Sequence, residues 1–345
     1  MIRHVEVVIP LFNSERFIGD TLTSIKKAKL KANIEVSILV VDDGSSDLSV
    51  PSVRDWANQE NFAVEIVNQP NKGRFEARLT GAKHSKSTWL LFLDSRVRLA
   101  EDSLANLANF EISNWLAING LTLTVEAGGL EASFWEVPTK FFWGESVSDP
   151  SPQPYSSGRF DKMPKGTTLL LIRRDTFLEL CASVDPLEKT RLISDDTRLL
   201  RGLAESGHFI FLPSFQASYV PHLGLGKFFA HLHNRGIVFW DSFRESKGKM
   251  KAVSILALVF PCLALAALMA FLFVFDGVWH FFATGVFILL FAWFLAVAAK
   301  RGASSRAILS FAVLVFPAIP VYWLGILRGI LLRGDFNFRR NPRND

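Results

Sequence analysis

Three long apolar runs near the C-terminal end constrain this chain more than any other feature of its sequence. None of them contains Asp, Glu, Lys or Arg; the runs are Ala252–Phe275, Gly277–Ala299 and Ala307–Leu327. A helix of about 20 apolar residues crosses the hydrocarbon core of a bilayer, so each run is long enough to do so. One such run alone is also typical of a buried helix in a soluble protein. Three in succession indicate a membrane region.

The net charge of the chain lies at the same end. Residues after Lys251 include eight Lys and Arg and three Asp and Glu, which accounts for the whole net charge of +5. Residues 1–251 carry thirty charges of each sign. Positive charge beside apolar runs is typical of a membrane surface. We therefore expect membrane lipids among the partners and no nucleic acid.

The first residues and the cysteines indicate the compartment. The chain enters a strand-like run at once, without a leader of signal-peptide length, and Cys181 and Cys262 are too few for a disulfide framework. We expect residues 1–251 in the cytoplasm and a multi-pass anchor in the cytoplasmic (inner) membrane. Pro317 and Pro320 interrupt the third run, which is interpreted as either a full crossing or a re-entrant or bent segment.

Strands and helices alternate over the first hundred residues. Strand-like runs are Val5–Pro10, Ile34–Val41, Ala63–Val67 and Thr88–Leu93, and helical stretches between them are Glu15–Lys31, about Val50–Glu60 and Phe75–Ser85. Strands that are apolar on both faces predict a mostly parallel, Rossmann-like sheet covered by helices. In such sheets, ligands bind just beyond the carboxyl ends of the strands.

Polar and acidic residues gather at those carboxyl ends. The first strand ends in Pro-Leu-Phe-Asn, the second in Asp-Asp-Gly-Ser and the fourth in Asp-Ser-Arg. A carboxylate accepts hydrogen bonds from a base N–H or from ribose hydroxyls. A DDGS turn alone is common in unrelated proteins, where it serves only as a turn. Its position after the PLFN strand favours a role in binding.

Three segments together carry a resemblance to a known family. The segments VVIPLFNSERFIGDTLTSI, ILVVDDGSSD and NKGRFEARLTGAKHSKSTWLLFLDS resemble the family 2 glycosyltransferases with a GT-A fold. The resemblance covers residues 5–95 well and continues loosely to Arg235-Gly236. It implies a nucleotide-sugar donor, with a UDP- or GDP-sugar expected, and inversion at the anomeric carbon.

The resemblance assigns a role to each matching residue. It places the turn and Glu15 beside the nucleobase, the acidic pair on base and ribose, and an arginine near the phosphates, a role that suits a permanently charged guanidinium. The nucleotide-sugar-binding residues expected are Pro10, Leu11, Asn13, Glu15, Asp42, Asp43, Arg78, Asp94, Ser95 and Arg96. Arg78 is also interpreted as an ordinary surface arginine of a helix.

The metal site of the family is altered in this sequence. Asp94 matches the first acid of a D-x-D motif that usually holds a divalent cation, but Arg96 replaces the second acid. One hypothesis is Mg²⁺ or Mn²⁺ bound by Asp94 with help from His222. The other is that Arg96 supplies positive charge directly.

The acceptor side of the site is expected later in the chain. Asp196, in a Ser-Asp-Asp segment, matches the general base that removes the acceptor proton, and Asp195 and Arg235 are expected near the acceptor or diphosphate. The two acids are also interpreted as first-turn residues of a helix that runs to Ser206. Arg235 also fits a residue that faces lipid headgroups.

The predicted organisation has four parts. A GT-A domain spans 1–225, an interfacial amphipathic helix 226–250, a membrane region 251–332 with runs 252–275, 277–299 and 307–332, and a basic tail 333–345. Within the first part, residues 126–165 are interpreted as a surface linker or a loop bordering the site. A further strand is expected at Thr167–Ile172.

These patterns predict a membrane-bound inverting glycosyltransferase of the hexosyltransferase type. We expect it to move a sugar from a nucleotide-sugar to a lipid-linked or cell-envelope glycan acceptor. Two alternatives stay open at this point: a polyprenyl-phosphate sugar synthase, and a catalytically impaired nucleotide-sugar-binding scaffold. A transporter fits poorly, because three apolar runs are few and carry almost no polar residues.

Overall fold

A computed structural model describes residues 2–125, 128–182, 197–221, 224–243 and 277–333 of the chain. Its internal contacts divide the chain into two units. Unit 1 comprises Met1–Ala127 with Glu145–Pro221, and unit 2 comprises Gly128–Gly144 with His222–Asp345. Residues 128–144, which the sequence places inside 1–225, therefore group with the C-terminal part. The predicted domain boundaries otherwise stay a prediction.

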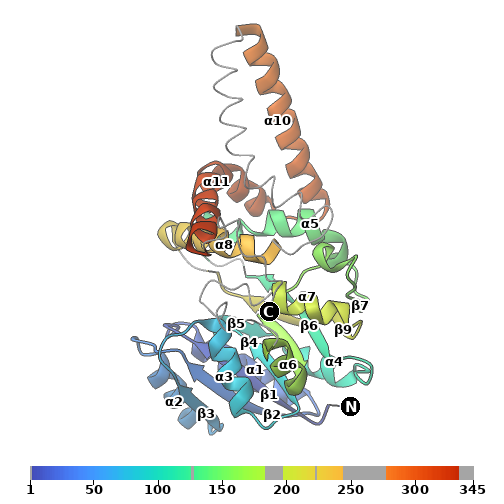
Figure 1. Cartoon of the computed structure of the whole chain (residues 1–345). Helices are drawn as coiled ribbons and strands as arrows, with labels where there is room; N and C mark the ends of the chain where they lie inside the picture. Colours follow the sequence, from blue (N-terminus) through green and yellow to red (C-terminus); the bar gives the residue numbers. More distant parts are fainter. Residues whose placement is uncertain (1, 126–127, 183–196, 222–223, 244–276, 334–345) are drawn as a thin grey trace, which may run out of the picture. The chain divides into compact units, whose positions relative to one another are not determined.

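Unit 1 is built on one mixed sheet with the strand order β3-β2-β1-β4-β8-β6-β9-β5, and β7 pairs with β9 (Figure 1). Its strands are β1 (His4–Leu11), β2 (Glu35–Asp42), β3 (Val64–Asn68), β4 (Trp89–Leu93), β5 (Val97–Leu99), β6 (Ala117–Thr124), β7 (Gln153–Pro154), β8 (Leu169–Arg173) and β9 (Phe209–Tyr219). The first four are mutually parallel, which confirms the predicted strand–helix alternation.

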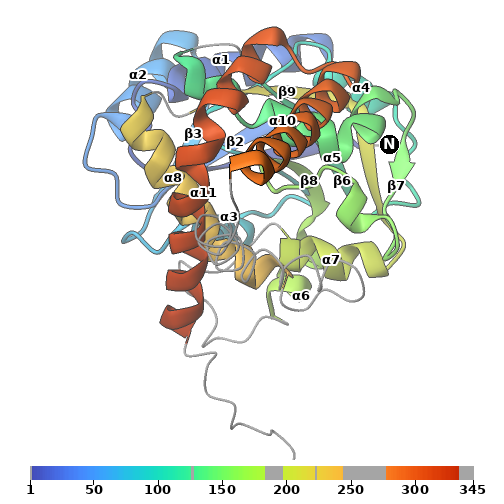
Figure 2. The same ribbon diagram turned by 90° about the horizontal axis from the view of Figure 1, so that it is seen from above.

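Helices cover both faces of this sheet (Figures 1 and 2). They are α1 (Ile18–Lys31), α2 (Ser49–Glu60), α3 (Arg74–His84), α4 (Ser103–Asn109), α6 (Arg174–Ala182) and α7 (Thr197–Glu205), with a short 3₁₀ turn η2 (Phe160–Lys162). The strands alternate between two apolar cores. In β4, Leu91 and Leu93 face the core shared with α1, α2 and α4, whereas Leu90 and Phe92 face the core shared with α3, α6 and α7.

The register of the parallel strands positions the site. Leu11, the last residue of β1, is paired with Asp42, the last residue of β2. Val8 of β1 is paired with Phe92, next to the end of β4. The residues that follow these strands therefore emerge at one edge of the sheet, as expected for parallel strands.

The stretch 126–165 is more ordered than the sequence indicates. It contains η1 (Leu130–Ser133), the helix α5 (Glu136–Ser148), β7 and η2. A description as a linker is therefore wrong for the described residues of this stretch.

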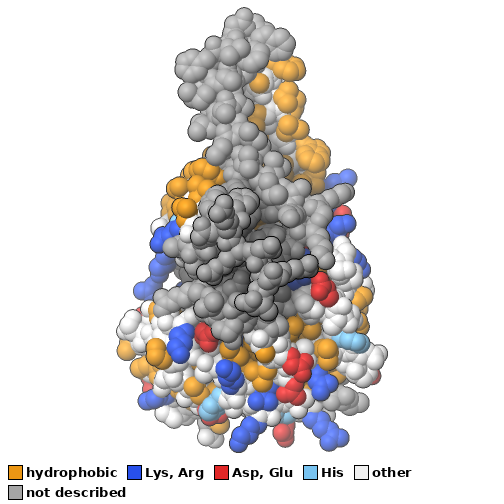
Figure 3. All heavy atoms as spheres, in the orientation of Figure 1, with side chains coloured by type: hydrophobic (Ala, Val, Ile, Leu, Met, Phe, Trp, Pro, Cys, Tyr) orange, Lys and Arg blue, Asp and Glu red, His pale blue; other side chains and the backbone are white. Residues whose placement is uncertain are grey.

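Unit 2 contains η1, most of α5, and the helices α8 (Leu225–Phe243), α10 (Gly277–Lys300) and α11 (Ser305–Arg333). α10 and α11 contain segments long and apolar enough to cross a membrane, Phe281–Lys300 and Ser305–Leu331. Most of the α10 segment is exposed, and Figure 3 shows hydrophobic side chains along this helix. The first predicted run, 252–275, and the basic tail from residue 334 lie outside the described residues.

Two details of unit 2 bear on the predictions. α8 is a helix, as expected for the amphipathic segment 226–250 over its described part. α11 is one continuous helix that includes both Pro317 and Pro320. The two prolines thus do not divide the third run into separate helices, although each removes a backbone donor from the helix interior.

Candidate active site

Loops after β1 and β2 are tied to one another at the edge of the sheet. Asn13 has a φ of 45°, a left-handed backbone conformation that asparagine tolerates. Its backbone N–H donates to Ser45 Oγ at 3.1 Å, and its Oδ1 accepts from the Ser46 N–H at 2.9 Å. Glu15 Oε2 accepts from the Leu48 N–H at 3.0 Å. The structure therefore ties Asn13 and Glu15 to the loop after β2: Asn13 contacts Ser45 and Ser46, and Glu15 contacts the backbone of Leu48.

The two carboxylates after β2 are buried and point to different neighbours. Asp42 Oδ1 accepts from the Ser45 N–H at 3.1 Å, which closes its own turn. Asp43 accepts from the backbone N–H groups of Lys72 and Gly73, at 2.7 and 2.8 Å, and from the Gln69 side chain at 2.7 Å. Three donors leave Asp43 little capacity for a ligand, so its visible role is to hold the loop before α3.

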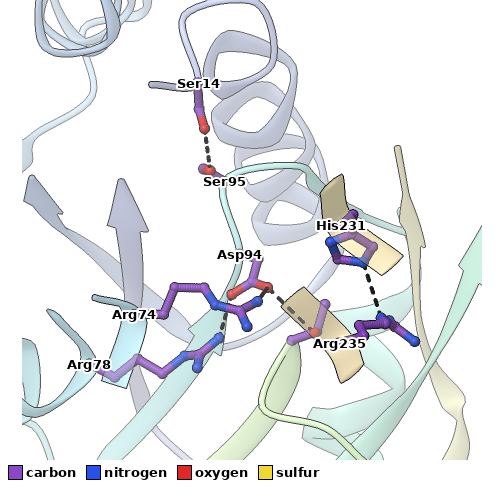
Figure 4. A network of polar contacts seen from close by, with 8 residues as sticks. Ser14, Arg74, Arg78, Asp94, Ser95, His231 and Arg235 are labelled. Atoms are coloured by element: carbon purple, nitrogen blue, oxygen red, sulfur yellow. Dashed lines mark hydrogen bonds and ion pairs between the residues drawn. The ribbon is translucent and has the colours of Figure 1, made fainter. Parts of the chain in front are cut away.

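Asp94, after β4, forms the charged centre of this edge (Figure 4). Its Oδ1 accepts from Arg78 Nη2 at 2.6 Å, and its Oδ2 lies 4.0 Å from Arg74 Nη1 and 3.4 Å from Thr168 Oγ1. The Arg78 side chain is 2% exposed and that of Asp94 14%, whereas the Arg74 side chain is 64% exposed. A buried ion pair is thus flanked by an arginine that solvent reaches.

Ser95 and Arg96 contact different parts of the loop after β1: Ser95 contacts Ser14, and Arg96 contacts Phe17. Ser95 is buried, and its hydroxyl donates to Ser14 Oγ at 2.8 Å, which links the β4 end to the β1 loop (Figure 4). The Arg96 guanidinium lies over the Phe17 ring, 4.4 Å from its centroid. Burial lowers the pKa of Arg96 from its usual value. Its position on an aromatic face is a cation–π contact.

Pro10 and Leu11, also predicted to bind the nucleotide, are both buried within the end of β1. Leu11 is fully buried, and its carbonyl accepts from the Asp43 N–H at 2.8 Å. These two residues therefore pack inside the protein at the end of β1. Between them and Asn13, the Phe12 side chain is 46% exposed.

The Asp94 carboxylate has a cationic side chain as its partner. Asp94 is paired with arginine, and the part of the chain that the structure describes contains no cluster of three His, Cys, Asp or Glu side chains with metal-ligand spacing. His222, the other predicted ligand, lies outside the described residues. So do Asp195 and the predicted general base Asp196.

Arg235 belongs to α8 in unit 2. Its Nε donates to His231 Nε2 at 3.0 Å, one turn earlier on the helix (Figure 4). Its guanidinium lies 4.4 Å from the centroid of the Trp135 ring. The exposed arginine therefore stands on an aromatic side chain of its own unit.

Sequence reasoning gave no role to two residues of this edge, Arg74 and Thr168. Arg74 follows Gly73, whose φ of 95° requires glycine, and the resemblance assigns a role to Arg78 but none to Arg74. Thr168 immediately precedes β8, and a predicted strand beginning at Thr167 gave a signal for its position. Only the antiparallel pairing of β8 with β4 brings it to Asp94.

In comparisons with known proteins, the N-terminal part of the chain is similar to glycosyltransferases. The model of the family "Glycosyl transferase family 2" matches residues 6–130. An uncharacterized glycosyltransferase, EpsJ, of Bacillus subtilis (strain 168) is 28% identical over 120 residues, which are 35% of this chain and 34% of EpsJ. The undecaprenyl-phosphate 4-deoxy-4-formamido-L-arabinose transferase of Proteus mirabilis (strain HI4320) is 28% identical over 107 residues, 31% of this chain and 33% of that enzyme.

These matches span about a third of the length of each relative. Among solved structures, the mannosyltransferase PcManGT from Pyrobaculum calidifontis, in complex with GDP-Man and Mn²⁺, superposes with a TM-score of 0.61 at 18% identity. That likeness covers 92% of this chain and 88% of the mannosyltransferase. At this identity it shows a shared fold.

Proposed function

The N-terminal part of this chain belongs to glycosyl transferase family 2, and on that premise we propose that the chain transfers a sugar from a nucleotide-sugar to a lipid-linked or cell-envelope glycan acceptor. The observation that carries the proposal is the charged edge of the sheet. There an exposed arginine, Arg74, stands beside the buried Asp94–Arg78 pair. A diphosphate bound at this edge would meet preorganised positive charge.

The nucleoside half of the donor would lie over the tied loops after β1 and β2. Asp42 accepts from one backbone N–H, which leaves lone pairs of its carboxylate for a base N–H or ribose hydroxyls. The half-exposed Phe12 ring offers a face for stacking of the base. Asp43, Asn13 and Glu15 act by holding the loops that form this surface.

Positive charge for the leaving diphosphate comes, in this proposal, from the protein. Arg74 would contact the phosphate oxygens, while Arg78 holds Asp94 in place. Mg²⁺ or Mn²⁺ at Asp94 with His222 stays a prediction, supported by the Mn²⁺ of the structurally similar mannosyltransferase. The described geometry favours the arginines, because the carboxylate at position 94 already has a cationic partner.

The chemical step would be an inverting displacement. The acceptor hydroxyl oxygen attacks C1 of the sugar, its proton passes to the carboxylate of Asp196, and the nucleoside diphosphate leaves with the bonding electrons. Asp195 and Arg235 would position the acceptor or the diphosphate. These roles rest on the family resemblance, since Asp195 and Asp196 lie outside the described residues.

The membrane would be the place of this reaction. α10 and α11 have the length and composition of spanning helices, and one relative acts on undecaprenyl phosphate by its name. We place the catalytic domain in the cytoplasm and the helices in the cytoplasmic membrane. A polyprenyl-phosphate sugar synthase remains the second candidate, favoured by the same relative.

Thermal unfolding of the full chain in detergent tests the donor site. UDP-, GDP- and dTDP-sugars are added singly, with and without Mn²⁺ and after exhaustive chelation. A bound donor raises the unfolding temperature, because it binds only the native state. Stabilisation that survives chelation supports the arginine site, and stabilisation that requires Mn²⁺ supports the cation instead. If none of the donors stabilises the chain, the proposal fails.

A matched pair of variants locates the diphosphate. Loss of a charge-assisted hydrogen bond costs about 1.5–3 kcal/mol, so Arg74→Ala should weaken donor binding by about tenfold or more. Arg54, an exposed arginine of α2, provides the control Arg54→Ala. Equal donor affinity in the two variants would remove Arg74 from the site. Turnover assays with extracted lipid-linked acceptors then separate an active transferase from an impaired scaffold.

A further inference from the structure

Unit 2 contains an apolar cavity that the proposed chemistry does not use. Its volume is about 400 Å³, and its lining comes from α5 and the residues before it, α8 and α11. The lining residues that matter below are Trp135, Leu232, Phe311, Val315, Ile319 and Tyr322. Ligand pockets of proteins range from about 300 to 1,000 Å³, so this cavity is at the lower end of that range.

A close crossing of two helices borders the cavity. Gly236 of α8 faces the backbone of α11, where a Cβ would overlap the carbonyl oxygen of Tyr322, and Gly325 of α11 faces the carbonyl of His233. The lining residues Leu232 and Tyr322 lie about one turn before these glycines on their respective helices. The backbones are therefore held together at the glycines, while larger side chains line the space beside them.

A positive charge lies next to one lining residue of the cavity. Trp135 lines it, and the exposed guanidinium of Arg235 lies 4.4 Å from the centroid of the same ring. His231, which accepts a hydrogen bond from Arg235, holds the guanidinium in this position. An occupant with an apolar body and an anionic end would match both the lining and this charge.

The cavity is also continuous with a surface suited to lipid. Ile319 lines it and is 49% exposed, and Phe316 on the same helix is 51% exposed. Both belong to the segment Ser305–Leu331, which is apolar enough to cross a membrane. A hydrocarbon chain could thus pass from a bilayer into the cavity along α11.

We propose that this cavity binds the single hydrocarbon chain of a lipid phosphate, with the phosphate at Arg235. The volume suits one chain better than the two chains of a bulk phospholipid. The inference rests on the proposed transfer to a lipid-linked acceptor and names the part of the chain that holds the lipid. All of the residues that line the cavity belong to unit 2.

Photolabelling of the full chain in detergent tests the cavity. The probe is a polyprenyl monophosphate with a benzophenone on its chain, and labelled peptides are identified by mass spectrometry. Ile319→Trp places an indole in the cavity at a site already exposed, which should preserve folding. Exclusion of two methylene groups costs about 1.6 kcal/mol, so labelling affinity should fall about tenfold or more. Val313→Trp, also exposed on α11 but outside the lining, should bind normally.

The charge is tested by comparing the phosphate probe with the corresponding polyprenyl alcohol. Arg235→Gln should reduce the preference for the phosphate about tenfold. Arg328→Gln, which changes an exposed arginine of α11, should preserve that preference. Phosphatidylglycerol, with two chains, should compete weakly.

Several results would overturn the inference. They are equal labelling of Ile319→Trp and Val313→Trp, no preference for the phosphate, equal competition by phosphatidylglycerol, and labelling confined to residues 252–275. Donor-induced thermal stabilisation is measured on the same preparations. If the donor stabilises the chain but the probe does not enter the cavity, the lipid inference fails while the proposed transferase stands.

Discussion

Replacement of Arg78 tests whether the buried Arg78–Asp94 ion pair stabilises the edge of the sheet at which we propose that the donor binds. Its guanidinium is 2.6 Å from Asp94, and the two side chains are 2% and 14% exposed. Arg78→Met removes the cation and leaves the Asp94 carboxylate buried. Breaking a buried pair in this way typically costs about 3–5 kcal/mol of unfolding free energy. Arg74, 4.0 Å away on the solvent side, compensates in part, so we expect about 3 kcal/mol.

This loss should be visible in thermal unfolding. For a domain of 150–250 residues, 1 kcal/mol corresponds to about 2–4 °C, so Arg78→Met should lower the unfolding temperature of unit 1 by about 6–12 °C. Differential scanning fluorimetry without donor measures it. The double variant Arg78→Met with Asp94→Asn has no unpaired buried charge. Its unfolding free energy should be about 1–2 kcal/mol higher than that of the single variant Arg78→Met, because the two sites are coupled.

The control is Arg54→Met on the exposed side of α2, which should change the unfolding temperature by no more than about 2 °C. The reasoning is refuted if Arg78→Met matches this control. Strict additivity of the two single changes would also refute it, since that result means the charges do not interact.

Two further predictions concern packing and pH. Gly236→Ala and Gly325→Ala should each destabilise unit 2 by about 1–3 kcal/mol, because the added methyl group overlaps the facing backbone. The matched control is Gly285→Ala, because Gly285 in α10 has open space around it. Equal thermal unfolding temperatures of all three variants would contradict the close crossing of α8 and α11. Burial lowers the pKa of Lys165 from 10.5 to about 8. Between these pH values the unfolded chain therefore binds more protons than the native chain. The unfolding free energy should rise with pH over this range, by on the order of 3 kcal/mol. Denaturant titrations from pH 8 to 10 should show the rise in the native chain and its loss in Lys165→Met; an identical pH dependence in both chains would exclude Lys165 as its source.

The sequence was sufficient for the first half of the sheet, because the pattern that predicts it is local. Apolar runs at β1, β2, β3 and β4, separated by helical periodicity, require no knowledge of distant contacts. The same holds for the carboxylates that follow the strands. Their burial at one edge follows from parallel pairing, which the alternation already implies.

Only the tertiary structure decided which of these side chains have hydrogen-bond partners within the protein. Asp42 and Asp43 are adjacent in the sequence, yet Asp43 is taken up by the loop before α3. Arg78 is read from the sequence as equally suited to the surface or the site, and only packing places it, buried, against Asp94. Hydrogen-bond partners of a polar side chain depend on backbone groups brought near by folding, and residue type alone does not specify them.

The two apolar runs that the structure describes, in α10 and α11, show the same division. Composition determined that α10 and α11 are long apolar helices, because twenty residues without charge have few other stable forms in a membrane. It did not determine that residues 128–144 join them in unit 2, or that Gly236 and Gly325 bring α8 against α11 beside a cavity. Such contacts arise between segments nearly a hundred residues apart, and their close fit depends on the shape of both surfaces, which no local periodicity records.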